Sequence, residues 1–410
     1  MGQVIFPYKT IRDIDLANKT VLLRADYNVP INSDGQISDD LRITSSLDTV
    51  SYLIKHQAKV AIISHLGRPK GQPDEKYSLR PVAVRLSKLL GQEVKFITDC
   101  VGKAVTAEIT AMRSGQVILL ENLRFYPGET NNDPSFAKEL ATSSRADLFV
   151  QDGFGVVHRA HASTAAITEM LPSVAGFLLE REYTQIKTAI ESPIRPLTTV
   201  IGGAKISDKM PMVRKFMDIA DNVVIGGALA NNFLRQAGYD VGDSLVEEGA
   251  QALTDEIKQK ADAKYGDRLA DRFILPVDVA VSLDGKLEGA KRAEKAVDQV
   301  KSPAVIYDIG EKTIKNIEKV IAKSGSVIWN GTLGMAEYPE FSRGSARLAL
   351  AIAKKPHITS LIGGGDTADF VRKWDALKGG SFSHVSTGGG ASLELMSGQD
   401  LPGIVALSRK

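Results

Sequence analysis

The sequence predicts an α/β protein made of two doubly wound parallel-sheet, Rossmann-like domains joined by a long helix and hinge. Short runs rich in valine, isoleucine and leucine alternate with helix-like stretches, which is the pattern of buried parallel strands joined by crossover helices. The chain has 410 residues, whereas a single hydrophobic core rarely grows beyond ~250–300 residues. We therefore expect each half of the chain to form one sheet.

Each half contains a series of apolar runs that we predict to be strands. In the first half these runs are Val21–Ala25, Val60–Ser64, Val94–Ile97, Val117–Leu120 and Leu148–Val150. In the second half they are Thr199–Ile201, Val223–Ile225, Phe273–Leu275, Val305–Tyr307, Val327–Trp329 and His357–Ile362. The stretches between them have helical patterns, as crossover connections require.

A predicted helix marks the domain boundary. Val174–Ile190 has helical periodicity and runs into Ser-Pro and Arg-Pro steps that should stop a helix. We expect an N-terminal domain at 1–175, an interdomain helix at 176–189 and a C-terminal domain at 190–394. Such a helix can act as a hinge or as a rigid connector, and the sequence leaves both open.

The composition limits the classes of function. With 43% hydrophobic and 24% charged residues and a formal charge of +2, the chain lacks the basicity that nucleic-acid or acidic-membrane binding would imply. Neither a secretory signal nor a run of ~18 apolar residues is evident, so we expect a cytoplasmic enzyme. The single cysteine, Cys100, cannot form an internal disulfide, and we assign it no function.

Charged and polar residues follow the apolar runs of the first half. Ligands of open parallel sheets bind beyond the carboxyl ends of the strands, so these positions are candidates for a binding site. The arginine guanidinium matches carboxylate and phosphate oxygens, and several together indicate a ligand with more than one anionic group. Any one arginine could be a solvated surface residue, but a series at successive strand ends favours a site. The candidates are Arg24, Asp26, Asn28, Arg42, His65, Arg68, Arg124 and Arg159.

The histidines of this half do not predict a metal site. His158 and His161 have a spacing that suits one face of a helical turn. Neither cysteines nor a matching carboxylate cluster accompany them, which disfavours zinc.

Glycine-rich segments follow the apolar runs of the second half. They read VIGGAKISDK, VIGGALANNF, WNGTLGMAE, LIGGGDTADF and VSTGGGASLEL. Glycine lets the backbone approach a phosphate, and the N–H groups of a following helix can bind its oxygens. Lys205 and Lys209 add positive charge, and Asp366 offers an oxygen ligand for the magnesium that accompanies nucleotides. Neither GxxxxGK[ST] nor GxGxxG occurs, so any nucleotide site must have another geometry.

Taken together, these segments resemble the motifs of the phosphoglycerate kinase family. The matching segments are RADYNVP, SHLGRP, LLENLRFYPGE, FGVVHRAHAS, GGAKISDK, WNGTLG, GGGDT and STGGGASLEL. They occur in the family's order and cover the chain from Val21 to Leu407. The resemblance implies an enzyme that transfers a phosphoryl group reversibly from 1,3-bisphosphoglycerate to MgADP, with Mg²⁺ as cofactor.

The resemblance also implies which residues bind each ligand. The N-terminal domain would bind 3-phosphoglycerate or 1,3-bisphosphoglycerate through Asp26, Asn28, Arg42, His65, Arg68, Arg124 and Arg159. The C-terminal domain would bind MgADP or MgATP through Lys205, Lys209, Gly226, Gly227, Asn330, Glu337, Gly364, Gly365, Asp366 and Thr367, with Glu337 on the ribose and Asp366 on the metal. The last residues, 395–410, would return to the N-terminal domain.

The chain departs from the family pattern at several positions. Thr332 stands where proline is usual, and Ala336 stands where an aromatic residue is usual. Both lie near the expected nucleotide pocket, so they bear on nucleotide affinity and purine preference. Tyr27 replaces the usual phenylalanine, and Gly153–Val157 is slightly altered, but neither change removes a charged group.

An acyl phosphate is already activated, so its transfer needs alignment and charge neutralisation more than a nucleophile or general base. We expect Arg42, Lys205, the magnesium and backbone amides near Gly365 and Gly389 to surround the transferring group. Transfer would be in line and would follow hinge closure, in a monomer whose partners are small molecules only.

Two alternatives remain open from the sequence. One is another P-loop-free kinase acting on a carboxylate, and the other is a two-lobed anion-binding protein without turnover.

Overall fold

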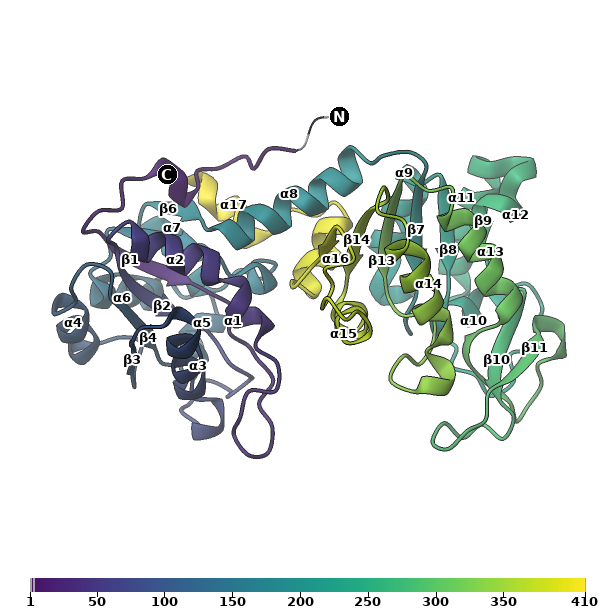
Figure 1. Cartoon of the computed structure of the whole chain (residues 1–410), viewed down its shortest axis with the longest axis horizontal. Coiled ribbons are helices and arrows are strands. Elements are labelled where there is room, and N and C mark those ends of the chain that lie inside the picture. The colour runs from purple at the N-terminus through teal and green to yellow at the C-terminus, as the bar shows by residue number, and fades with distance from the viewer. Residues whose placement is uncertain (1, 3, 410) are drawn as a thin grey trace. The chain divides into compact units, whose positions relative to one another are not determined.

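Two compact units make up the chain. The computed structural model describes residue 2 and residues 4–409. We call Ile5–Thr184 with Asp400–Lys410 the N-terminal unit, and Met1–Val4 with Gln185–Gln399 the C-terminal unit. Each unit contains a parallel sheet of six strands with helices around it (Figure 1), which confirms the predicted fold class.

The sheet of the N-terminal unit has the strand order β3-β4-β2-β1-β5-β6, and every pairing is parallel. The central strand β1 has β2 on one side and β5 on the other, so the chain winds outward in both directions from it. Ligands of such sheets bind at this kind of switch point. The strands are β1 (Thr20–Arg24), β2 (Lys59–Ile63), β3 (Val94–Ile97), β4 (Val117–Leu120), β5 (Leu148–Gln151) and β6 (Ser173–Ala175).

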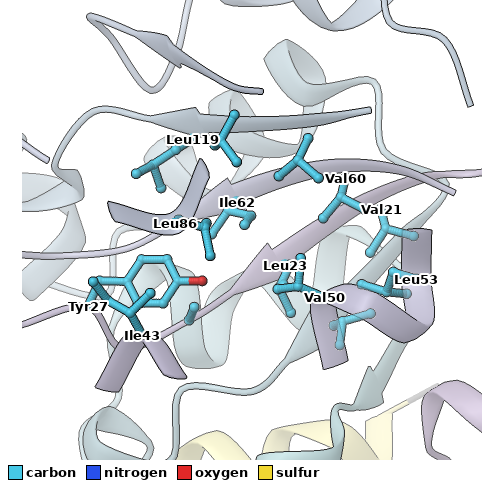
Figure 2. Close-up of a cluster of buried hydrophobic side chains, with 14 of the residues drawn as sticks. Val21, Leu23, Tyr27, Ile43, Val50, Leu53, Val60, Ile62, Leu86 and Leu119 are labelled. Carbon is cyan, nitrogen blue, oxygen red and sulfur yellow. The ribbon is translucent and has the colours of Figure 1, made fainter. Parts of the chain in front are cut away.

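Both faces of this sheet are buried because alternate residues of each strand point to opposite sides. In β1, Val21 and Leu23 belong to one apolar cluster and Leu22 to another. Figure 2 shows the first cluster, in which β1, β2 and β4 pack against helices α2 and α3. This double burial explains the continuous apolar runs in the sequence.

The helices of the N-terminal unit begin and end at residues suited to those positions. Asp133 caps α6 by accepting a hydrogen bond from the Ser135 amide at 2.8 Å, and Pro134 occupies the first turn. Gly91 ends α3 with a φ of 66°. The helices are α1 (Leu41–Ser45), α2 (Leu47–Lys55), α3 (Arg80–Leu90), α4 (Lys103–Thr110), α5 (Pro127–Thr130), α6 (Pro134–Ser144), α7 (Ile167–Met170), α17 (Pro402–Val405) and α8 (Phe177–Glu191), whose residues from Gln185 onward belong to the C-terminal unit.

The long helix α8 corresponds to the interdomain helix expected at 176–189. The stretch of helical periodicity was placed too early, because its first residue, Val174, lies in β6, which pairs with β5. Asp152 sets the start, because its Oδ1 accepts hydrogen bonds from the amides of Leu178 at 2.9 Å and Leu179 at 3.2 Å. A side chain from the end of β5 therefore supplies the N-terminal cap that local sequence did not show.

The C-terminal unit has a parallel sheet with the strand order β15-β14-β13-β7-β8-β9. A separate antiparallel sheet has the order β11-β10-β12. The predicted strand at Val305–Tyr307 belongs to this second sheet, so the expectation of a single sheet in this half was wrong. The strands are β7 (Leu197–Ile201), β8 (Asn222–Ile225), β9 (Phe273–Ile274), β10 (Asp278–Ser282), β11 (Ala293–Ala296), β12 (Val305–Ile309), β13 (Ser326–Asn330), β14 (Thr359–Gly363) and β15 (His384–Val385).

The helices of the C-terminal unit cover its parallel sheet. The core between them includes Trp329 of β13, which is fully buried. The helices are α9 (Met210–Ile219), α10 (Gly227–Gln236), α11 (Gln251–Tyr265), α12 (Leu269–Arg272), α13 (Glu311–Ile321), α14 (Arg343–Ala353), α15 (Gly365–Trp374) and α16 (Gly390–Met396). Among the described residues, no helix combines the length and apolar character needed to cross a bilayer.

The end of the chain packs within the N-terminal unit from Asp400 onward, whereas residues 395–399 belong to the C-terminal unit. Leu401, Ile404 and Leu407 are buried. The Gly403 amide donates a hydrogen bond to the Val157 carbonyl at 2.8 Å. This segment therefore forms part of the N-terminal core.

Candidate active site

Asp26 is the centre of a charged cluster in the N-terminal unit, directly after β1. Arg42 of α1 forms an ion pair with Asp26 through Nη1 and Oδ2. His65, which follows β2, places Nε2 4.0 Å from Asp26 Oδ1. Asp26 and His65 are buried, whereas the Arg42 side chain is 31% exposed. The guanidinium of Arg42 is thus accessible to solvent, whereas the carboxylate of Asp26 that it contacts is enclosed.

Asn28 and Arg124 extend this cluster through the backbone of the loop after β2. The backbone N–H of Asn28 donates to Asp26 Oδ1 at 3.1 Å, and the side-chain Oδ1 of Asn28 accepts from the Gly67 backbone N–H at 2.8 Å. Arg124 Nη1 donates to the Gly67 carbonyl at 2.8 Å. Five of the predicted substrate residues are therefore joined by contacts: Asp26, Asn28, Arg42, His65 and Arg124.

Two predicted arginines have no contact with this network. Arg68 is exposed and forms no hydrogen bond or ion pair with any residue that the structure describes. Arg159 is also exposed, and its Nε donates to His158 Nε2 at 3.2 Å. Burial, followed by the charges of Arg24 and Arg159, lowers the pKa of Arg124 to about 10. Arg159 is therefore near enough to act on Arg124 electrostatically, although it does not touch it.

The protonation states follow from this crowding. Burial alone would raise the pKa of Asp26, but the charge of Arg42, with the Asn28 backbone hydrogen bond and the charge of Arg24, outweighs it and lowers that pKa to about 2. Burial lowers the pKa of His65 well below its usual value, which favours the neutral ring near pH 7. The site at neutral pH combines one ionised carboxylate with several guanidinium groups, so it favours an anion.

A second layer of buried polar groups supports the cluster. Arg24 is fully buried, and its Nε donates to Ser163 Oγ at 2.8 Å. Glu129 Oε1 accepts from Ser163 Oγ at 2.6 Å and lies 3.8 Å from Arg24 Nη2. Arg24 Nη2 also lies 3.1 Å from His65 Nδ1. This layer holds the His65 ring in place.

Sequence reasoning missed Glu129 and Ser163. Glu129 lies in the quoted motif LLENLRFYPGE, so an acidic residue in an otherwise basic set was an available signal. Ser163 likewise ends the quoted motif FGVVHRAHAS, although a serine there carries no charge that would mark it.

The C-terminal unit contains a cavity of about 380 Å³ next to its glycine-rich segments. Of the predicted nucleotide residues, Gly227, Glu337 and Asp366 line this cavity, and so does Thr332. Its other walls are mostly apolar and include one aromatic side chain, Tyr307. A cavity of this size, with few polar groups among apolar walls, is typical of a small-molecule site.

Lys209 is held at the carboxyl ends of β7 and β13. Its Nζ donates to the Gly202 carbonyl at 2.6 Å and to Asn330 Oδ1 at 2.9 Å. Asn330 is buried, and its Nδ2 has no partner among the described residues. Burial lowers the pKa of Lys209 to about 8, although Asp366 opposes the shift. Lys209 Nζ also donates to the Asn330 carbonyl at 3.4 Å, so Lys209 contributes mainly positive charge, and the free donor of the pair is Asn330 Nδ2.

Gly226 and Gly227 form the turn from β8 into α10. Gly227 has a φ of +64°, and a Cβ there would lie 2.6 Å from the Gly203 amide nitrogen. A Cβ on Gly226 would lie 2.4 Å from the side chain of Leu333. Gly227 lines the cavity and has no room for a side chain, so the backbone itself forms this wall.

The start of α15 provides backbone amides and a carboxylate. Gly364 has a φ of +90° and leads into Gly365 and Asp366, both exposed. Thr367 is buried, and its Oγ1 accepts a hydrogen bond from the Gly331 amide at 2.7 Å. Free amides at a helix start suit phosphate oxygens.

The other predicted residues of this unit do not line the cavity: Lys205, Lys209, Gly226, Asn330, Gly364, Gly365, Thr367 and Gly389. Lys205 is exposed, and Gly389 precedes α16.

Asp366 fits a magnesium ion that arrives with a nucleotide. Mg²⁺ usually keeps several waters and takes one or two carboxylates plus substrate phosphates. Asp366 is an exposed carboxylate on the cavity wall, which meets that need. Among the described residues, no group of three or more His, Cys, Asp or Glu side chains is suited to a resident metal.

Comparisons with known proteins agree over the length of the chain. The family model described as phosphoglycerate kinase matches residues 11–399. A curated phosphoglycerate kinase of Dictyoglomus turgidum is 45% identical over 400 residues, covering 98% of each chain. One of Pelotomaculum thermopropionicum is 43% identical over 402 residues, covering 98% of this chain and 99% of the relative.

Solved structures give the same result. The phosphoglycerate kinase of Coxiella burnetii matches with a TM-score of 0.86 at 38% identity, covering 98% of this chain and 99% of that one. That of Pyrococcus horikoshii matches with a TM-score of 0.81 at 32% identity, covering 98% of each chain.

Proposed function

This chain belongs to the phosphoglycerate kinase family, and we propose that its N-terminal unit binds the phosphoglycerate while its C-terminal unit binds the nucleotide. The family prediction from the motifs is confirmed. The chain is a glycolytic transferase with a carboxyl group as phosphoryl acceptor, EC 2.7.2.3. The two alternatives, another carboxylate kinase and a binding protein without turnover, are not favoured.

The Asp26 cluster supports the first assignment. Arg42, Arg124 and the buried Arg24 surround a small polar region with more positive than negative charge. A ligand with a carboxylate or acyl phosphate at one end and a phosphate at the other would neutralise it. Arg68 and Arg159, which are exposed and make no ion pair, complete the proposed set by binding the second anionic group. Asp26 accepts a hydrogen bond from the substrate hydroxyl, and the side-chain NH2 group of Asn28 donates one to the hydroxyl oxygen.

The 380 Å³ cavity supports the second assignment. Its apolar walls suit a base, Glu337 suits ribose hydroxyls, and Gly226 and Gly227 allow close approach of the nucleotide. Lys209, Asn330 and the start of α15, from Gly364 to Thr367, supply donors for phosphate oxygens. Magnesium, when bound through Asp366, neutralises phosphate charge.

The transfer step itself is electrostatic. Arg42 and Lys205, with backbone amides at Gly365 and Gly389, neutralise the transferring phosphoryl group. In-line attack requires the reacting atoms to approach to about 3–3.5 Å. Because the two ligands are assigned to different units, the units close during the reaction. We place this reaction in the cytoplasm and in a monomer.

Kinetics of two variants test the assignment. MgATP-dependent phosphorylation of 3-phosphoglycerate is followed by coupling the product to NADH oxidation. Arg42→Ala should impair turnover while leaving MgADP affinity intact, and Lys209→Ala should weaken MgADP binding while leaving 3-phosphoglycerate affinity intact. If the two variants affected the ligands in the reverse sense, the assignment of units would be wrong.

A further inference from the structure

A basic cavity of about 350 Å³ lies in the C-terminal unit, away from the residues assigned above. Four cationic side chains and one carboxylate line it: Arg195, Lys264, Arg268, Arg272 and Asp221. The remaining wall is formed by Pro196, Ala220 and Tyr265. Surface cations usually have carboxylate partners close by, so this imbalance in a concave site needs an explanation.

This cavity and the nucleotide cavity lie at opposite ends of the same three strands. Strands β7, β8 and β9 are parallel neighbours. Their amino ends directly follow Pro196, Asp221 and Arg272, which line the basic cavity. Gly203, Gly227 and Pro276, which line the nucleotide cavity, come after their carboxyl ends. In Figure 1, α12 accordingly lies at one end of this unit and β10 and β11 at the other.

One of the four cations has a structural task. Lys264 Nζ donates to the carbonyls of Met217 and Ala220, both at 2.6 Å, and so completes the end of α9. A cation is expected at the carboxyl end of a helix. Lys264 therefore contributes charge to the cavity but has few donors left for a ligand.

The three arginines keep most of their donors free. Arg195 uses only Nη1, which donates to Ile219 O at 2.7 Å and Asp221 Oδ2 at 2.9 Å. Arg272 likewise uses only Nη1, which donates to Asn222 Oδ1 at 2.9 Å. Arg268 is exposed and forms no hydrogen bond or ion pair within the described part of the chain. Each retains an Nε and Nη2 edge, the edge that binds phosphate oxygens in pairs.

We propose that this cavity is a second anion site that binds a small molecule carrying two phosphate groups. Three guanidinium edges can pair with more oxygens than one phosphate offers, and the cavity has the volume of a small-molecule site. Asp267 and Asp271 are exposed and directly precede Arg268 and Arg272 in the sequence, which disfavours an extended polyanion such as nucleic acid. The Tyr265 ring gives the ligand's non-ionic part a surface to contact.

Inorganic pyrophosphate is the probe, and fluorine NMR of 3-fluorotyrosine-labelled full-length protein is the readout. Tyr265 lines the basic cavity and Tyr307 lines the nucleotide cavity, so one spectrum reports on both sites separately. Each resonance is assigned with a Tyr→Phe variant. The titration is run without magnesium and at constant ionic strength set with sodium chloride.

The Tyr265 resonance should shift saturably with pyrophosphate. Arg268→Gln and Arg272→Gln should each lower the affinity for pyrophosphate, read from the midpoint of that shift, by roughly tenfold. Each substitution removes a charge-assisted pair of hydrogen bonds. The matched control Arg235→Gln removes an exposed arginine of the same unit that does not line the cavity, and it should leave the shift unchanged. A Tyr265 resonance that does not move, or that responds equally in Arg268→Gln and Arg235→Gln, would overturn the proposal.

Discussion

The proposed ligand sites of the two units are built from different parts of the chain. The N-terminal site is built from charged side chains, some of which form ion pairs with one another: Asp26 with Arg42, and Glu129 with Arg24. The proposed C-terminal site is built largely from backbone at Gly227 and near Gly364, with one partly buried ammonium, that of Lys209. Substitutions that remove a charge should therefore impair the N-terminal site most. Substitutions that add a side chain to a glycine should impair the C-terminal site most.

The largest effect is expected at Glu129, which should matter through stability. Removing one partner of a buried ion pair typically costs about 3–5 kcal/mol, and both Glu129 and Arg24 are fully buried. Glu129→Gln should therefore lower the free energy of unfolding of the N-terminal unit by about that amount. Urea unfolding followed by circular dichroism measures the loss, and hydrogen exchange in β1 and β5 assigns it to this unit.

The control for that variant is Glu108→Gln, which breaks an exposed ion pair with Lys95. It should change the stability by less than ~1 kcal/mol. Equal losses of unfolding free energy in the two variants would show that the buried charge of Glu129 stabilises the unit no more than an exposed charge does.

Arg42 tests the same site through catalysis. Losing one preorganised donor to a developing charge typically costs ~2.7–4 kcal/mol, so Arg42→Ala should lower turnover by ~10²–10³ with the fold intact. The matched control is Arg85→Ala, which removes an exposed partner of Asp40 in the same unit. Near-normal turnover of Arg42→Ala, with Arg85→Ala unaffected as well, would remove Arg42 from the mechanism.

Gly227 tests the backbone site. Gly227→Ala adds a methyl group against the Gly203 backbone and holds a non-glycine residue at a φ of +64°. The strain alone costs ~1–3 kcal/mol, and the displaced wall should weaken MgADP binding by at least tenfold. The matched control is Gly249→Ala, because Gly249 has a φ of +75° and open space around the added Cβ. This variant should lose stability through backbone strain but keep its affinity for MgADP. Calorimetric titration with MgADP distinguishes them, and an unaltered affinity in Gly227→Ala would refute the proposed wall.

The single ammonium of the C-terminal site predicts a pH dependence. Lys209 has a pKa of about 8 because it is buried, so it loses its positive charge as the pH rises through 8. The KM for MgADP should therefore rise several-fold between pH 7 and pH 9. Lys209→Arg stays protonated over this range and should abolish the rise. A KM that is constant in the unmodified chain, or that rises equally in the arginine variant, would exclude Lys209 as the titrating group.

Ala336 should give the smallest effect. It lies between Met335 and Glu337, both of which line the nucleotide cavity, and the Met335 amide bonds to the Tyr307 carbonyl at 2.8 Å. Ala336→Phe should tighten purine binding by roughly 0.5–1.5 kcal/mol if the added ring reaches the base. Competition between MgADP and MgGDP measures it, and weaker binding would show that the cavity has no room for that ring.

Much of the fold was predictable because buried parallel strands leave a strong signal. Val94–Ile97 and Val117–Leu120 were predicted residue for residue. Strand β11 was not predicted, because Ala293–Ala296 is mostly half-exposed and has no apolar run. Strand β10 was overlooked although it is fully buried and contains the apolar run Val279–Val281. Val174 was misplaced because the cap that starts α8 comes from Asp152, a contact invisible to local periodicity.

The site residues could be predicted from the sequence only where they belong to a recognisable motif. Asp26 and Arg42 were expected together and do meet, but the arrangement that joins Arg24, Glu129 and Ser163 depends on loops brought together by folding. The prediction for Arg68 stays a prediction, because this exposed side chain has no contact that would place it at the site.

The return of the chain end to the N-terminal unit has a consequence for synthesis. Leu401, Ile404 and Leu407 fill part of a core whose other residues precede Gln185. At ~5–20 residues per second, a nascent chain waits on the order of tens of seconds between making that core and making the segment that completes it. The N-terminal unit is thus the first to be translated and the last to be finished, so an incomplete chain released early carries an unfilled apolar surface.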